Sequence, residues 1–177
     1  MRRSHGILLF LFGAWIAGTV LMAAVAAGNF DQVKPEKHPR LDEVFARIPD
    51  AERVPALRFV ASEMNRRYFT IWNITEIGFA LVALALVLGA RVRGESSRSL
   101  LIAVAVIAAI CVFLGTYMAP HIVDLGRAID FIDRTSPAGI DAVARFHSQH
   151  GTYMAIDLVK LLVTAACSLS LMLPRRR

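Results

Sequence analysis

Residues 69–90 read FTIWNITEIGFALVALALVLGA, an apolar run in which Glu76 is the single charged residue. An α-helix rises about 1.5 Å per residue, so a run of this length matches the ~20 residues that cross the hydrocarbon core of a bilayer. Similar runs lie on either side of it, at 6–27, 100–119 and 152–173. We therefore predict an all-α protein, an up-down-up-down bundle of four transmembrane helices that extend beyond the outer membrane face.

The composition favours one integral membrane domain over residues 1–177. Of the 177 residues, 56% are hydrophobic and the mean hydropathy is +0.53, which leaves little chain for a separate soluble domain. The net charge is +6, but the basic residues lie beside the apolar runs, where they act as topology signals. We expect no nucleic-acid partner. The expected partners are the lipid bilayer and, within it, another membrane protein or a second copy of the chain.

Arginines at the ends of the apolar runs predict the orientation. They precede the first run, separate the second from the third, and follow the fourth: Arg2, Arg3, Arg91, Arg93, Arg98, Arg175, Arg176 and Arg177. Basic residues beside spans are held on the cytoplasmic side. We therefore expect a multi-pass protein of an inner or plasma membrane with both termini cytoplasmic, and extracytoplasmic helical loops at about 28–68 and 120–151.

The first run has a second interpretation, a cleaved signal peptide. Arg2 and Arg3 form a basic start, and Ala24-Val25-Ala26 resembles a cleavage site. The run is nevertheless close to a full span, longer than the apolar region of a typical signal peptide. Its length favours retention as a transmembrane helix.

Helical patterns continue outside the apolar runs. With Pro55 in its first turn, the second helix is expected to run from about Pro55 to Val92, and the third is expected to continue past Pro120 to about Arg134. Ser136 is a candidate N-cap for a helix that leads into the fourth run. Leu41, Val44, Phe45 and Ile48 have the spacing of a short amphipathic helix.

Three ionisable residues lie within the apolar runs, namely Glu76, Asp157 and Lys160. At 1.5 Å per residue, Glu76 lies about 12 Å inward from Tyr68, and Asp157 and Lys160 lie about 9 and 14 Å inward from Gly151. Charges at such depth are rare and are candidates for function. One hypothesis is a structural polar clamp between helices, and another is a proton or ion site in a transport path. In a third, Lys160 merely extends toward the interface.

Histidines near the outer face form a second candidate site. His147 and His150 are three residues apart, and His121 follows the third run, so the set has donors suited to a metal or haem. The alternative is that these are solvated or hydrogen-bonded interface histidines. No HExxH, CxxC or CxxCH motif accompanies them, and we expect no cofactor.

No sequence motif supports catalysis. The chain has no glycine-rich phosphate loop and no Ser, Cys or Thr in a nucleophile motif. Cys111 and Cys167 lie within apolar runs, where a thiol behaves as a small hydrophobic group. We predict that the protein is not an enzyme and has no catalytic residues.

The segment Phe146-x-x-x-His150-Gly151 carries a family resemblance, together with Pro120 after the third run and Tyr68-Phe69 before the second. With these features the chain resembles the four-helix membrane proteins of domain of unknown function 4149, the group of the transmembrane protein 205-like proteins. The resemblance implies four spans and no established activity, and it singles out His150. The chain departs from that group in the polar insertion 31–53 and in its Asp157 and Lys160 charges.

These patterns lead to three functional hypotheses. The first is a non-enzymatic accessory or interaction protein of the membrane, of otherwise uncharacterised function, whose protruding helices contact a partner. The second is a small transporter or ion-conducting module that uses Glu76, Asp157 and Lys160. The third is a metal- or haem-binding membrane protein that uses His121, His147 and His150.

Overall fold

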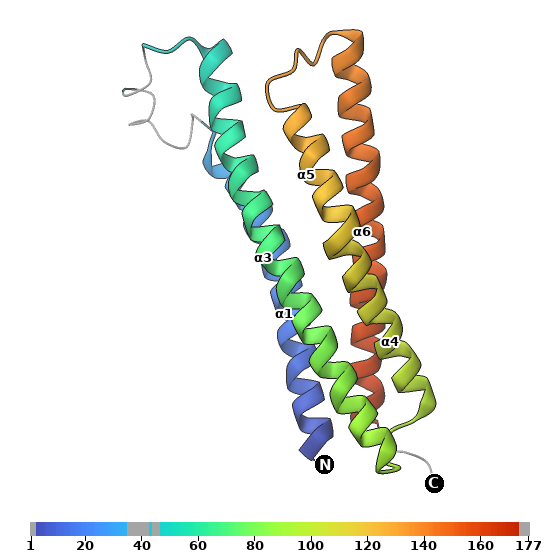
Figure 1. Cartoon of the computed structure of the whole chain (residues 1–177). Helices are drawn as coiled ribbons and strands as arrows, with labels where there is room; N and C mark the ends of the chain where they lie inside the picture. The colour runs from blue at the N-terminus through green and yellow to red at the C-terminus, as the bar shows by residue number, and fades with distance from the viewer. Residues whose placement is uncertain (1–2, 35–42, 44–46, 174–177) are drawn as a thin grey trace.

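The computed structural model describes the whole chain except residues 1–2, 35–42, 44–46 and 174–177, and it is an all-helical bundle (Figure 1). The helices are α1 (Arg3–Gln32), α3 (Asp50–Val92), α4 (Arg98–Phe113), the π-helix η2 (Leu114–Met118), α5 (Ala119–Ala128) and α6 (Pro137–Met172). Because α4, η2 and α5 follow one another without a break, the described chain forms four long rods. Each rod is long and apolar enough to cross a membrane.

The rods form a bundle in which consecutive rods run in opposite directions (Figure 1). Helix α1 packs against α3 and α6, and α4 packs against the same two helices. Helices α3 and α6 therefore face each other across the bundle. Helix α1 begins, and α6 ends, at the end of the bundle where α3 turns into α4. This is the predicted up-down-up-down fold.

The larger of two apolar core clusters lies nearer the end of the bundle that holds the termini. It combines Leu8, Phe12, Trp15, Ala80, Ala83, Val87, Leu100, Val104, Ile107, Ala108, Cys111 and Cys167. One close approach depends on a glycine. A Cβ atom on Gly18 would lie 2.0 Å from Cη2 of Trp72, so the indole can pack against α1 only because residue 18 has no side chain.

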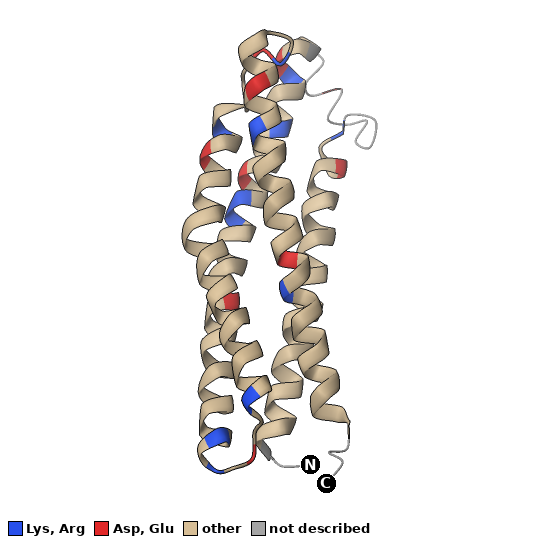
Figure 2. Ribbon diagram, turned by 90° about the vertical axis from the view of Figure 1, so that its right-hand side faces the viewer, with Lys and Arg blue, Asp and Glu red and all other residues tan. Residues whose placement is uncertain are grey.

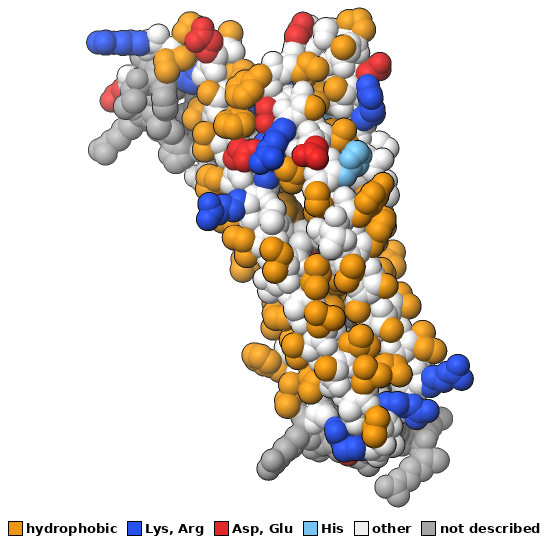
Figure 3. All heavy atoms as spheres, viewed as in Figure 1, with side chains coloured by type: hydrophobic (Ala, Val, Ile, Leu, Met, Phe, Trp, Pro, Cys, Tyr) orange, Lys and Arg blue, Asp and Glu red, His pale blue; other side chains and the backbone are white. Residues whose placement is uncertain are grey.

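The outer surface is apolar along the middle of the bundle. Large apolar side chains point outward from every rod, for example Phe10, Leu81, Ile102 and Leu162. Charged residues gather toward the two ends of the ribbon, with few between them (Figure 2), and hydrophobic side chains cover the middle of the face in Figure 3. Apolar patches of this extent are unusual for a soluble monomer, and they suit contact with lipid.

Two predicted helix ends differ from the structure. Helix α3 begins at Asp50, so Pro55 lies inside it instead of in its first turn. The amides of Glu52 and Arg53 both bond to the Pro49 carbonyl, which starts the helix one turn earlier than predicted. The predicted continuity up to Val92 is confirmed. Leu41, Val44 and Phe45 of the predicted amphipathic helix lie outside the described residues.

The third rod ends at Ala128, six residues before the predicted Arg134. Asp133 accepts hydrogen bonds from the backbone amide and the hydroxyl of Thr135, at 2.9 and 2.7 Å. Side-chain bonds of this kind offer the backbone an alternative to the helix. The predicted cap is confirmed, because Gly139 N donates to Ser136 Oγ at 3.1 Å at the start of α6.

The π-helix η2 is a feature that the sequence did not predict. It widens the rod just before Pro120, and the amide of Ala119 bonds to the carbonyl of Leu114. Proline has no N–H and crowds the carbonyl four residues before it. The wider turn of η2, one turn before Pro120, accommodates the proline without ending the rod.

Candidate functional site

The structure brings the three ionisable residues of the apolar runs into one buried cluster. Lys160 of α6 donates from Nζ to Glu76 Oε1 of α3, at 2.5 Å. Both side chains are only 1% exposed. Because α3 and α6 face each other across the bundle, this ion pair lies between opposite helices and links them through the interior.

Asp157 is the third member of the cluster. Its Oδ1 lies 2.5 Å from Lys160 Nζ, one helical turn away on α6. The ammonium thus lies between two carboxylates. The Asp157 side chain is 22% exposed, whereas Glu76 is enclosed. The two acids therefore differ in their access to the surface of the chain.

Helix α1 supplies two further donors that the sequence reasoning missed. Trp15 Nε1 donates to Glu76 Oε1 at 2.8 Å, and Thr19 Oγ1 donates to the same oxygen at 3.2 Å. With Lys160, three donors from two helices converge on one carboxylate oxygen, an arrangement suited to an anion. The available signal was the spacing of Trp15 and Thr19, which are four residues apart on one face of the first apolar run.

A neutral polar contact lies next to the charges. Tyr153 donates from its hydroxyl to Asn73 Oδ1 at 3.1 Å, and Asn73 Nδ2 donates to the Phe69 carbonyl at 2.8 Å. This contact also joins α6 to α3. Helix η2 lies beside this contact: a Cβ on Gly115 would lie 3.0 Å from Ile77 Cδ1 and 3.4 Å from the Asn73 Cβ. Helices α3 and α6 are thus joined at two adjacent levels.

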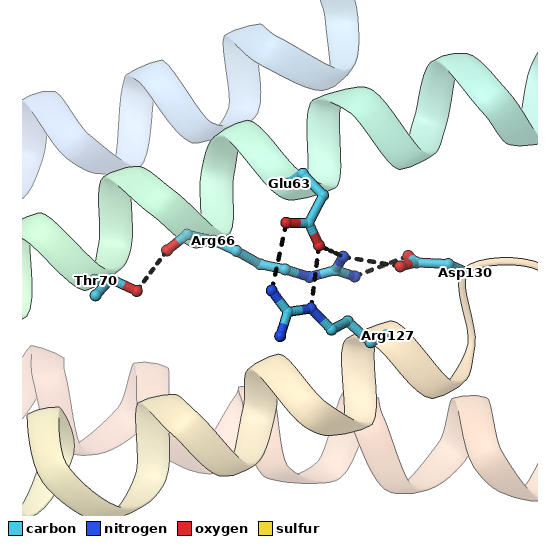
Figure 4. Close-up of polar contacts among 5 residues, drawn as sticks. All are labelled: Glu63, Arg66, Thr70, Arg127 and Asp130. Atoms are coloured by element: carbon cyan, nitrogen blue, oxygen red, sulfur yellow. Dashed lines mark hydrogen bonds and ion pairs between the residues drawn. The ribbon is translucent and has the colours of Figure 1, made fainter.

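A second charged cluster lies outside the apolar segment 69–90 and joins α3 to the end of α5 (Figure 4). Arg66 donates two hydrogen bonds of 2.8 Å to the Asp130 carboxylate and one of 2.6 Å to Glu63. Arg127 reaches Glu63 at 3.3 and 3.5 Å. The hydrogen bonds from Arg127 and Arg66 lower the pKa of Glu63 below its ordinary value. These residues were missed because single charges outside a span normally indicate a solvated surface.

The structure does not bring His121, His147 and His150 together. His121 is exposed on α5, and His147 is exposed on α6. The half-buried His150 stacks on Phe146, with ring centroids 5.6 Å apart and an interplanar angle of 8°. Within the described ranges, no group of three His, Cys, Asp or Glu side chains is placed to hold a metal ion. A Cβ on Gly151 would meet no atom within 4 Å, so packing does not require this glycine.

Comparisons with protein-family models, curated proteins and solved structures found no match for this chain. The resemblance to the four-helix membrane proteins of domain of unknown function 4149 thus stays a prediction. The site itself joins one cation and two carboxylates at mid-length in a bundle whose middle surface is apolar.

Proposed function

We propose that this protein is a multi-pass membrane protein with both termini in the cytoplasm and that it acts as a non-enzymatic accessory or interaction protein. Four long apolar rods support the membrane location. The arginines beside the apolar runs support the orientation. The bundle geometry agrees with it, because α1 begins and α6 ends on the same side.

The observation that carries this proposal is the enclosure of the Glu76–Lys160 pair. Lys160 at 1% exposure contacts both carboxylates, and Glu76 accepts from α1 as well as from α6. A charge buried without a partner is strongly destabilising, whereas a paired and hydrogen-bonded charge specifies how helices pack. The cluster therefore acts as a structural clamp that fixes α1, α3 and α6 together.

The parts of α3 and α6 beyond the apolar segments provide the contact surface. Val54 and Val60 on α3 are 42% and 50% exposed, and Ile140 on α6 is 56% exposed. Phe131, which follows α5, is 68% exposed. Apolar side chains in a charged, polar region are typical of protein contact sites. We infer that the partner is a membrane protein that contacts this extramembrane end.

A photo-cross-linking residue placed at Val60 or Ile140 tests this proposal in native membranes. Discrete protein adducts are expected at both sites. Leu81 and Leu162 lie within the apolar runs 69–90 and 152–173 and are 57% and 61% exposed. They are the matched controls and should yield lipid adducts. The absence of protein adducts at all four sites, or equal yields of protein adducts at all four, would contradict the proposed contact surface.

A transport role is the second candidate, and one observation favours it. Asp157 is 22% exposed although it lies within the apolar run, so one member of the charge cluster is reachable from outside the bundle. The proposed metal or haem site has no comparable support, since the three histidines do not converge. Proteoliposomes that contain a pH-sensitive dye would reveal transport as a proton flux that depends on Asp157.

A further inference from the structure

The buried cluster contains one more negative than positive group. Glu76 and Asp157 each contribute a carboxyl group, and Lys160 contributes the ammonium that contacts both. If all three were ionised, the cluster would carry a net charge of −1. A net charge within a membrane span is costly, so the cluster needs one additional cation or proton.

The two carboxyl groups are not equivalent. Glu76 accepts from Trp15, Thr19 and Lys160 and is 1% exposed. Asp157 contacts Lys160, and the described residues provide no other side-chain donor for it. Hydrogen bonds from several donors favour the ionised form of an acid. Glu76 is therefore the acid whose carboxylate has the more donors, and Asp157 is the acid with the fewer.

The neighbouring groups do not remove the excess charge. On α6, Asp157 lies within electrostatic range of Lys160 and of Tyr153, whose hydroxyl bonds to Asn73. Helix α3 contributes Glu76, and α4 contributes Cys111, which interacts with the same three charges. Helix α1 contributes the neutral donors Trp15 and Thr19. Among the described residues of these helices, Lys160 is thus the one cation beside the two acids.

We propose that the cluster of Glu76, Asp157 and Lys160 binds one exchangeable proton and that Asp157 accepts it. A hydronium ion transfers a proton to Asp157, which forms the Asp157 O–H bond and leaves a water molecule. Lys160 keeps its own protons, and the cluster becomes neutral. The ammonium then pairs with Glu76 alone. After release of the proton, Asp157 competes for the ammonium, which weakens the link from α6 to α3. The clamp therefore responds to proton concentration.

This inference rests on the proposed membrane location, because lipid is what makes the extra charge costly. Infrared difference spectra of the full-length protein in lipid nanodiscs provide the test. The pH is varied only above about 5.5, where solvated carboxylates stay ionised. In this range acidification should produce the C=O band of a carboxylic acid in wild type, and potentiometric titration should record about one proton more per chain than in Asp157→Asn. The neutral amide of Asp157→Asn mimics the protonated acid, so this variant is expected to fold.

Asp124→Asn, which removes an exposed acid of α5 outside the cluster, is the matched control and should retain the band. An unchanged band and unchanged proton uptake in Asp157→Asn would overturn the proposal. So would a band that sodium ions abolish at constant pH, because the counter-ion would then be a metal cation. Alkaline carbonate extraction of the same membranes tests the membrane location separately, since a peripheral protein is released whatever its proton binding.

Discussion

The substitution Lys160→Met separates the charge of Lys160 from its packing. Methionine retains most of the apolar stem in the core but removes the ammonium that contacts Glu76 and Asp157. The Glu76 carboxylate would stay 1% exposed, with Trp15 and Thr19 as its remaining donors. Removal of one partner from a buried ion pair costs about 3–5 kcal/mol. We expect a loss of this size in the free energy of unfolding at neutral pH.

Reversible unfolding in detergent, followed by the fluorescence of Trp15 and Trp72, measures this loss. The double variant Lys160→Met/Glu76→Gln removes the unpaired carboxylate as well and should recover most of the stability. Lys34→Met is the matched control, because Lys34 is 53% exposed in an ion pair with Asp31 and such surface pairs contribute about 0–1 kcal/mol. The reasoning is refuted if Lys160→Met is no less stable than Lys34→Met, or if the double variant recovers nothing.

Other contacts of the bundle give three more predictions. Trp15→Phe removes the indole donor of Glu76 and should lower the free energy of unfolding by about 1.5–3 kcal/mol; Thr19→Val, which removes a longer bond, should have a smaller effect in the same assay. Gly18→Ala places a Cβ 2.0 Å from the Trp72 ring and should destabilise by about 1–3 kcal/mol, whereas Gly13→Ala, whose Cβ meets no atom within 4 Å, should melt like wild type. Arg127 and Arg66 lower the pKa of Glu63 in the folded protein below 4.5. The contribution of the Glu63 carboxylate to the free energy of unfolding should therefore be complete above pH 4.5 and be lost as the pH falls through the pKa of the folded state. Glu63→Gln should lack this acid-dependent loss, and a stability profile in acid equal to that of wild type would contradict the assignment.

The sequence was sufficient to predict the helices, because the periodicity and the length of an apolar run are local properties of the chain. The run 69–90 and its helical continuation toward Pro55 predicted one rod, and the structure extends that rod only to Asp50. The end of α5 was harder to predict, since it depends on the turn that Asp133 forms with Thr135 and on the ion pair between Arg66 and Asp130. Neither effect appears in a hydrophobic pattern.

The site could be predicted in part for a similar reason. Glu76, Asp157 and Lys160 stand out because ionisable groups are rare in apolar runs. Trp15 and Thr19 do not stand out, since both residue types are ordinary in a membrane span, and their role depends on how α1 is rotated against α3. The histidine hypothesis relied on the adjacency of helices, but sequence spacing within one helix cannot tell which face a neighbouring helix presents.

Thiol labelling in intact cells tests the central claim most directly, namely that these rods cross a membrane with the charge cluster inside it. Ser99 in the first turn of α4 and Ala138 in the first turn of α6 are both exposed. These two helices begin at opposite ends of the bundle (Figure 1). A membrane-impermeant maleimide should label Ala138→Cys in intact cells and Ser99→Cys only after permeabilisation, and the chain should stay with the membrane in alkaline carbonate. Labelling of both sites in intact cells, or release of the chain into the aqueous fraction, would contradict the account.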